Sequence, residues 1–349
     1  MEGRTARPRI ADVARKAGVS KTAVSFAFNS PERLSAQTAA RIRDVAERLG
    51  YRPNPVARML TQRQTMTLGV LTPQALAVIF SNPFFALFSE GVAEAAEELG
   101  YELHFISPLH GSLAMAMGRA MVDGVVAIGL SADHPEVGQI EAAGLPMVLV
   151  DSEDLAGHSS VVVDDEAGAR AAAEHLIALG HRDILILAVE GPQPAGNQPE
   201  HHGVSERRLR GYQAALEKAG LELRSDHVVA GRASIPGGAA TFERALAAGI
   251  RPTAVLAMSD AMAIGAVRHA REQGLRIPDD LSVVGFDDVD LAAHVDPPLT
   301  TVHQPIREKG AVAARLLLAR IAVGASHRPE RVRLATELVV RSSTAVANR

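Results

Sequence analysis

The chain has 349 residues, of which 47% are apolar and 22% charged, with a formal net charge of −4 and no cysteine. Chains beyond about 250 residues usually split into domains, so we expect two or three globular domains. The absence of cysteine excludes disulfides, thiolate metal sites and cysteine nucleophiles. The N-terminus has no apolar signal core, and no apolar stretch of about 18 residues follows. We therefore expect a cytoplasmic protein that does not span a membrane.

The charge is distributed unevenly along the chain. Residues 1–64 carry 13 Lys and Arg against 5 Asp and Glu, whereas residues 65–349 carry 23 against 35. A basic segment attached to an acidic body indicates that this segment binds a polyanion. Nucleic acid is the first candidate and a membrane surface is the second.

Three short helices are predicted in the basic segment. The apolar positions of IADVARKA, at 10–17, recur at helical spacing. Ser20 can cap a second helix over 21–28, and Ser35 can cap a third that runs to about Leu49.

Three such helices with a tight turn predict an all-α helix-turn-helix domain over residues 1–50. Residues 51–66 hold two prolines and then VARML. An isolated helix of this length is unstable in water. We therefore expect a linker whose hinge helix forms only when something packs against it.

From residue 67 the chain alternates between short apolar runs and helical stretches. Strands are predicted at TLGVLT, YELHFIS, DGVVAIG, PMVLV, DILILAV, HVVAG, TAVLAMS, LSVVGFD and TTV. Helices are predicted near residues 84–99, 112–121, 135–143, 166–179, 206–219, 238–248, 260–273 and 306–322. The loop at 190–205 is expected to be exposed. This alternation predicts an α/β body with parallel sheets that are covered by helices on both faces.

The body at 67–349 is expected to form two doubly wound parallel-sheet lobes. The first lobe is expected to take about residues 67–164 plus 302–325. The second is expected to take about 165–301 plus 326–349. The late stretch 299–341 would then cross back to complete both lobes.

Six stretches in register resemble the LacI/GalR family of bacterial transcription regulators, from about residue 9 to 341. They are IADVARKAGVSKTAVSFAFN, LGYRPNPVARML, LGV followed by SNPFF, RRLRGYQAAL, MSDAMAIGAVRHAREQGLRIPDDLSVVGFDD and PPLTTVHQP. The resemblance implies dimers or tetramers whose helix-turn-helix domains read a palindromic operator in double-stranded DNA. It also implies a body like a periplasmic sugar-binding protein, with a small effector held between the two lobes and no cofactor. The C-terminus has no heptad pattern, which argues against a tetramerising coiled coil.

The resemblance assigns DNA contacts to the second helix, which would enter the major groove. Lys21, Thr22 and Phe26 match the family's base readers, and Ser25 and Asn29 match its phosphate contacts. The alternative is that these are merely solvated residues of a small helical domain. Phe26 stands where many relatives carry an arginine that holds guanine. It could contact a thymine methyl, stack along the groove wall or turn inward as core.

Two further positions outside that helix bear on DNA binding. Arg9 stands where relatives often have a threonine cap, which leaves the start of the first helix without its usual cap. Leu60 matches the hinge-helix leucine that relatives insert into the minor groove, where an apolar wedge kinks the duplex. The alternative is that the hinge is a plain flexible tether.

The effector site is expected where strand ends converge at the junction of the two lobes. By resemblance its residues are Phe85, Asp151, Arg208, Ser259 and Asp287. Three of them have a structural alternative: Phe85 could be core, Asp287 could cap a turn, and Arg208 in RRLR could be solvated surface. Ser259 replaces an asparagine common in sugar-responsive relatives. The stretch QALAVIFSNPFF is also longer than the usual junction, which predicts a distinctive cleft wall.

Other functions find less support in the sequence. The adjacent His201 and His202 lack a third ligand at useful spacing, so we expect no metal. Asp287 and Asp288 could do acid and base chemistry, but no phosphate loop, nucleophile elbow or metal cluster accompanies them. We therefore predict no enzyme activity. A solute-binding protein without DNA function is the alternative to a dimeric repressor whose effector rotates one lobe against the other.

Overall fold

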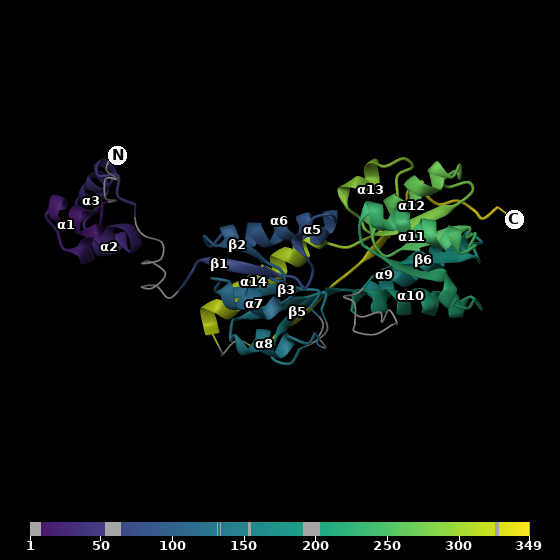
Figure 1. Ribbon diagram of the computed structural model, residues 1–349, viewed down its shortest axis with the longest axis horizontal. Helices are drawn as coiled ribbons and strands as arrows, with labels where there is room; N and C mark the ends of the chain where they lie inside the picture. The colour runs from purple at the N-terminus through teal and green to yellow at the C-terminus, as the bar shows by residue number, and fades with distance from the viewer. Residues whose placement is uncertain are drawn as a thin grey trace. The chain divides into compact units, whose positions relative to one another are not determined.

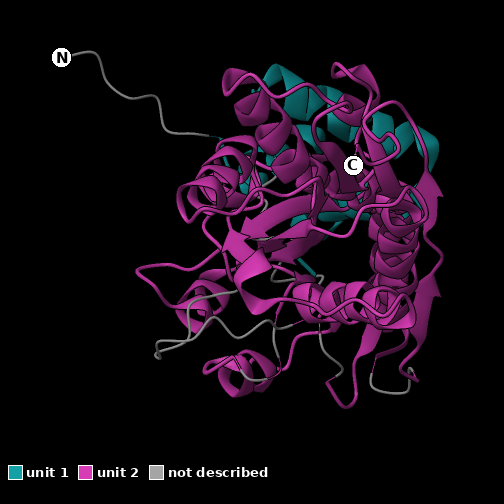
Figure 2. Cartoon of the chain, turned by 90° about the vertical axis from the view of Figure 1, so that its right-hand side faces the viewer, with its two compact units in different colours: residues 1–65 teal, residues 66–349 magenta. Residues whose placement is uncertain are grey.

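The computed structural model describes residues 8–52, 64–130, 132, 134–152, 155–190, 203–324 and 328–348. The chain divides into two compact units, residues 1–65 and 66–349 (Figure 2). Leu60 with most of the predicted hinge, and His201 with His202, lie outside the described residues. Within the described part of the chain, no helix is long and apolar enough to cross a bilayer.

The first unit contains the predicted helices α1 (Ile10–Ala17), α2 (Lys21–Asn29) and α3 (Ala36–Arg48), with the short 3-10 helix η1 (Pro31–Arg33) between the last two. Two serines cap their helices as predicted. The Ser20 hydroxyl accepts the Ala23 N–H at 3.1 Å, and the Ser35 hydroxyl accepts the Thr38 N–H at 3.2 Å. Each cap satisfies an orphan donor at a helix start.

The start of α1 is capped from inside the helix. The Asp12 carboxylate accepts the backbone N–H of Arg9 at 2.9 Å and pairs with Arg15 at 2.7 Å. A carboxylate in the first turn also lies favourably in the helix dipole. The missing threonine at Arg9 is therefore compensated by Asp12.

The second unit holds two six-stranded sheets, one in each lobe (Figure 1). In the first lobe the strands lie in the order β11 (Arg331–Leu334), β5 (Ser159–Val163), β4 (Met147–Val150), β3 (Gly124–Ile128), β1 (Thr67–Leu71) and β2 (Glu102–Ile106). All its pairs are parallel. One face packs against α6 (Pro83–Glu97) and α14 (Ile306–Val323), and the other against α7 (Leu113–Arg119) and α8 (Val137–Ala142).

The second lobe repeats this plan. Its strands lie in the order β12 (Glu337–Val339), β10 (Thr300–His303), β9 (Ser282–Asp287), β8 (Ala254–Ala257), β6 (Ile184–Val189) and β7 (Val228–Gly231). All pairs are parallel except β10 with β12. One face packs against α9 (Asp165–Ala178) and α10 (Val204–Lys218), and the other against α11 (Ile235–Ala247) and α12 (Asp260–Glu272). The two parallel α/β lobes agree with the predicted fold class.

Some elements were not predicted from the sequence. They are α5 (Leu76–Ile79), β5, η2 (Ser225–His227), α13 (Asp290–His294), β11 and β12. The expected lobe boundary is wrong at 331–334, because β11 pairs with β5 of the first lobe rather than joining the second. It is also wrong at 302–303, because these residues belong to β10, which pairs with β9 and β12 of the second lobe. The sequence RVRL alternates exposed and half-buried residues at the sheet edge. It therefore lacks the continuous apolar run by which buried parallel strands are identified.

Candidate functional site

The first candidate surface is the exposed side of α2. Lys21 and Thr22, at the start of this helix, are exposed. Ser25 and Asn29 are half-buried one turn apart, and the Asn29 amide donates to the Ser25 hydroxyl at 3.2 Å. Cationic, hydroxyl and amide groups on one helix are the groups that contact base edges and phosphates.

Phe26 is half-buried but lies outside the apolar cluster of the first unit, which is built around residues such as Val24, Ala27 and Ile42. Its ring instead carries the guanidinium of Arg33, whose Cζ lies 5.1 Å from the ring centroid. This distance is typical of a cation–π contact. The inward packing of Phe26 therefore does not occur. The sequence analysis missed Arg33, although NSPER places a cation just after this helix.

The second candidate site is a cavity of about 560 Å³ that both lobes line. All five residues predicted for the effector site line it, and each comes from the end of an element. Phe85 lies in α6, Asp151 directly follows β4, Arg208 lies in α10, Ser259 precedes α12, and Asp287 ends β9. Carboxyl ends of parallel strands and helix starts converge there, as the fold requires.

Arg208 is only 4% exposed, so it is not solvated surface. Its Nε donates to Asp165 Oδ1 at 2.9 Å, it also donates to the Met258 carbonyl, and its Cζ lies 3.5 Å from the centroid of the Phe286 ring. Burial alone would raise the pKa of Asp165, but the guanidinium groups of Arg208 and Arg207 outweigh burial and lower it. The arginine is thus held rigidly and already has a counter-ion.

Asp287 accepts a hydrogen bond from the Gln304 amide at 2.6 Å and is 3% exposed. Burial raises the pKa of Asp287 to about 6, although Arg208 and Gln304 act in the opposite direction. Burial, together with the neighbouring Asp287, also raises the pKa of Asp260 well above its usual range. The backbone of Asp287 has φ 126°, a strained value of the kind that clusters at functional sites.

Asp151 is tied to a residue that the sequence analysis missed. Lys309 Nζ lies 2.9 and 2.7 Å from the two carboxylate oxygens of Asp151 and 2.6 Å from Gln304 Oε1. Lys309 is completely buried. It lies in a stretch that was interpreted only as a helix, since a lysine in an amphipathic helix usually indicates its solvated face.

The remaining lining residues shape the walls of the cavity. Ser259 is 2% exposed and caps α12 by accepting the Met262 N–H at 3.2 Å. Gln74, Ala75 and Val78, from the long junction after β1, also line the cavity. This junction therefore forms part of the cleft wall through α5 and the residues just before it, and its distinctiveness among relatives stays a prediction. Phe85 lines the cavity while also packing against the core of the first lobe.

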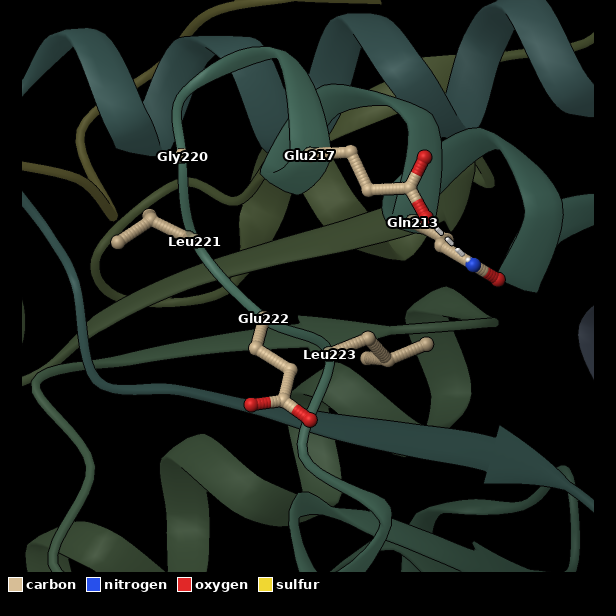
Figure 3. A pocket seen from close by; sticks show the side chains of 6 residues that line it. All are labelled: Gln213, Glu217, Gly220, Leu221, Glu222 and Leu223. Atoms are coloured by element: carbon tan, nitrogen blue, oxygen red, sulfur yellow. Dashed lines mark hydrogen bonds between the residues drawn. The ribbon is translucent and has the colours of Figure 1, made fainter.

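A second hollow of about 580 Å³ lies on the second lobe, at the end of α10 (Figure 3). Gln213 and Glu217 of α10 are joined by a 2.7 Å hydrogen bond on one side, and Glu222 lies on the other. Leu221 and Leu223 belong to the core packing of this lobe. None of the predicted site residues lines this hollow, so the cleft between the lobes is the stronger candidate.

Metal binding finds no support in the described part of the chain, where no group of three or more His, Asp or Glu side chains is placed to hold an ion.

Two family descriptions match the chain. Residues 9–54 match the bacterial regulatory proteins of the lacI family, and residues 173–344 match a periplasmic binding protein-like domain. The transcriptional regulator CelR of Thermobifida fusca is 35% identical over 350 residues, which is 97% of this chain and 99% of CelR. DegA of Bacillus subtilis, also named a transcriptional regulator, is 32% identical over 97% of this chain and 98% of DegA.

Solved structures of two relatives also match this chain, and their matches cover both the N-terminal unit, here called the head, and the second unit, called the body. The lac repressor dimer, bound to operator and an anti-inducer, covers 97% of this chain and 100% of its own with a TM-score of 0.80 and 29% identity. A CelR–cellobiose complex covers the same shares with a TM-score of 0.69 and 33% identity. These relatives are transcription regulators rather than enzymes or solute carriers. The chain therefore belongs to the LacI family of DNA-binding transcriptional regulators.

Proposed function

We propose that the chain is a cytoplasmic repressor that binds a palindromic operator as a homodimer. A small, uncharged, hydroxyl-bearing effector in the cleft changes its operator affinity. The observation that carries the proposal is the cleft itself, where five predicted residues from both lobes line one cavity. The two relatives with solved complexes support it, since one is bound to operator and the other to cellobiose.

The charges around the cleft favour a neutral effector. Arg208 is paired with Asp165, and Lys309 is paired with Asp151. Arg232, which also lines the cavity, pairs with the exposed Glu190 at 3.3 Å. Because each of these three cations already has a carboxylate partner, an anionic ligand would find no unpaired positive charge. Asp287 and Ser259, which are 3% and 2% exposed, still offer polar atoms with which ligand hydroxyl groups can form hydrogen bonds.

On the DNA side, Lys21, Thr22 and Phe26 read bases, while Ser25 and Asn29 hold phosphates. Arg33 lies beside the same part of the duplex as Phe26, because its guanidinium group lies over the Phe26 ring. Leu60 of each subunit wedges into the minor groove at the operator centre. Effector binding rotates the lobes and so changes the spacing of the two hinge helices, with a coupling of about 1 to 3 kcal/mol.

The test begins with selection of bound duplexes from a random pool, followed by titration of the enriched duplex by fluorescence anisotropy. Cellobiose, ribose and other neutral sugars are added, with sugar phosphates as charged controls. We expect a palindromic half-site and at least one neutral sugar that changes the Kd by about 5-fold to 150-fold. Failure to enrich any duplex, or a response to sugar phosphates alone, would contradict the proposal. Asp287→Ala should bind the duplex but lose the sugar response.

A further inference from the structure

Lys309 is buried beside the cleft although it does not line the cleft itself. It is fully buried in the first turn of α14 and is not among the residues that line the cavity. Three residues that do line it surround its ammonium group. These contacts are the ion pair with Asp151 at 2.7 Å, the Gln304 Oε1 atom at 2.6 Å, and the Phe84 ring with its centroid at 5.2 Å.

The contacts of Lys309 continue into the second lobe. Asp151 follows β4 of the first lobe, and Gln304 lies in the crossover between β10 and α14. The Gln304 Nε2 atom donates to Asp287 Oδ1, at the end of β9 in the second lobe, at 2.6 Å. A continuous path of hydrogen bonds therefore joins the strand-end carboxylates of the two lobes.

Lys309 determines which way the Gln304 amide points. An ammonium group has only donors, whereas a glutamine amide has one accepting oxygen and one donating nitrogen. If the amide were turned over, its NH2 group would face the ammonium, and its oxygen would face the Asp287 carboxylate. Both contacts would then be repulsive. With Lys309 in place, only the orientation that donates to Asp287 is satisfied.

The helix that carries Lys309 is fixed to the first lobe. A Cβ atom at Gly310 would lie 2.2 Å from the Phe88 carbonyl oxygen, and one at Gly91 would lie 1.9 Å from the Arg307 carbonyl oxygen. The backbones of α6 and α14 are therefore in direct contact, as their adjacent ribbons in Figure 1 indicate. A shift of the second lobe cannot carry Lys309 with it and must act on the bond between Gln304 and Asp287.

We propose that Lys309 is a positioning residue that couples cleft occupancy to the first lobe. It orients Gln304 so that Asp151 and Asp287 are held as one unit in a single lobe arrangement. An effector that engages Asp287 loosens or tightens this unit and so shifts the balance between lobe arrangements. The output of this coupling, a change in operator affinity, rests on the proposed function.

Two variants of the full chain test the coupling. Lys309→Met combined with Asp151→Asn removes both charges, because Lys309→Met alone would leave a buried carboxylate unpaired. Gln304→Leu cuts the path but leaves the ion pair between Lys309 and Asp151 in place. Arg307→Ala is the matched control, since Arg307 lies on the same helix and forms an exposed pair with Glu90 at 2.7 Å.

The first measurement is amide hydrogen exchange of residues 287–289 without ligand. We expect about tenfold faster exchange in both test variants, as for the loss of one buried hydrogen bond, and no change in the control. A purely local structural role would loosen only residues 147–152 of the first lobe. Wild-type exchange at 287–289 in both test variants would overturn the proposal.

The second measurement is the ratio of operator Kd values with and without a saturating neutral sugar, chosen as the sugar to which the wild type responds most strongly. Saturation separates the coupling from any change in sugar affinity. We expect the ratio to fall to about one in both test variants and to keep its wild-type value in Arg307→Ala. An unchanged ratio in the test variants would contradict the coupling. If the wild type binds neither duplex nor sugar, the proposed function fails, and the exchange experiment still decides the role of Lys309.

Discussion

The head and the body carry their candidate functional side chains in opposite ways. In the head, which is residues 1–65, all of them except Leu60 lie within the nine residues of α2, where they are exposed or half-buried and close in sequence. In the body they come from positions as distant as Asp151 and Lys309, and most are nearly inaccessible. Exposed charges contribute little to stability, whereas buried charges strongly affect it. Substitutions in the head should therefore alter DNA binding alone, while substitutions in the cleft should alter stability and ligand response together.

The largest effect on stability is expected from substitution of Asp165, which is 1% exposed. Its carboxylate accepts hydrogen bonds from Arg207 and Arg208, both at 2.9 Å. Asp165→Asn would leave two guanidinium groups without their buried counter-ion. We expect a loss of about 3 to 5 kcal/mol in the free energy of unfolding, as for other broken buried pairs. Urea denaturation of the full chain measures it.

The control for Asp165 is Glu206→Gln, since Glu206 forms an exposed pair with Arg210 at 2.8 Å. Its loss should cost less than about 1 kcal/mol. Equal losses in the free energy of unfolding for the two substitutions would contradict the expectation that buried ion pairs affect stability more than exposed ones.

Substitution of Leu60 tests whether a change in the head alters DNA binding without altering the stability of the body. If Leu60 unstacks a base step, Leu60→Ala should weaken operator binding about tenfold or more, because the bend that the wedge produces permits contacts that outweigh the few kcal/mol cost of unstacking. The urea midpoint of the body should remain at its wild-type value. Operator titration by anisotropy checks the first statement, and unchanged affinity would remove the wedge from the account.

Phe26 tests specificity rather than affinity. Phe26→Arg should shift the selected half-site toward guanine at the base that this side chain faces, with discrimination of about 1 to 3 kcal/mol. Arg33→Ala should weaken binding of the wild-type half-site, since Arg33 lies over the Phe26 ring. Selection from a random pool measures both. If the wild-type protein already selects that guanine, the proposed contact of Phe26 with this base would be contradicted.

The effect expected for Asp287 is confined to a narrow range of pH. The folded protein keeps the Asp287 proton up to about pH 6, whereas an unfolded aspartate loses it near about pH 3.9. The folded state therefore binds more protons between these values, so this group lowers stability as pH rises from about 4 to 6. Asp287→Asn should remove a drop of about 3 kcal/mol from the stability profile, since each unit of pKa shift corresponds to about 1.4 kcal/mol.

The control for this titration is Asp290→Asn, at the exposed start of α13. Urea midpoints at several pH values should follow the wild-type profile in this control. If the urea midpoint of Asp287→Asn also changed with pH as it does in the wild type, another group would be the cause of the pH dependence.

The sequence predicted most of the fold because periodic apolar runs and caps are local signals. Ser20 and Ser35 cap their helices as expected, and the end of β9 and the first turns of α10 bring Asp287 and Arg208 to one cavity. Lys309 could not be predicted, since its burial depends on the close contact of α6 and α14 and its partner lies 158 positions away.

Phe26 and β11 show two other limits of the sequence. The inward and outward orientations of Phe26 have the same helical spacing, so only packing decides between them. The alternating pattern of β11 extends over only four residues, which is too short to identify a strand without its pairing partner β5.

The proposed regulator divides its functions between a basic DNA-binding head and an acidic ligand-sensing body. The most direct measurement compares the full chain with residues 66–349, which form a compact unit of their own. The selected duplex and the sugar that acts on the full chain are titrated against both. We predict that the body alone loses duplex binding and keeps its sugar affinity. A body that still holds the selected duplex as tightly as the full chain would contradict the claim.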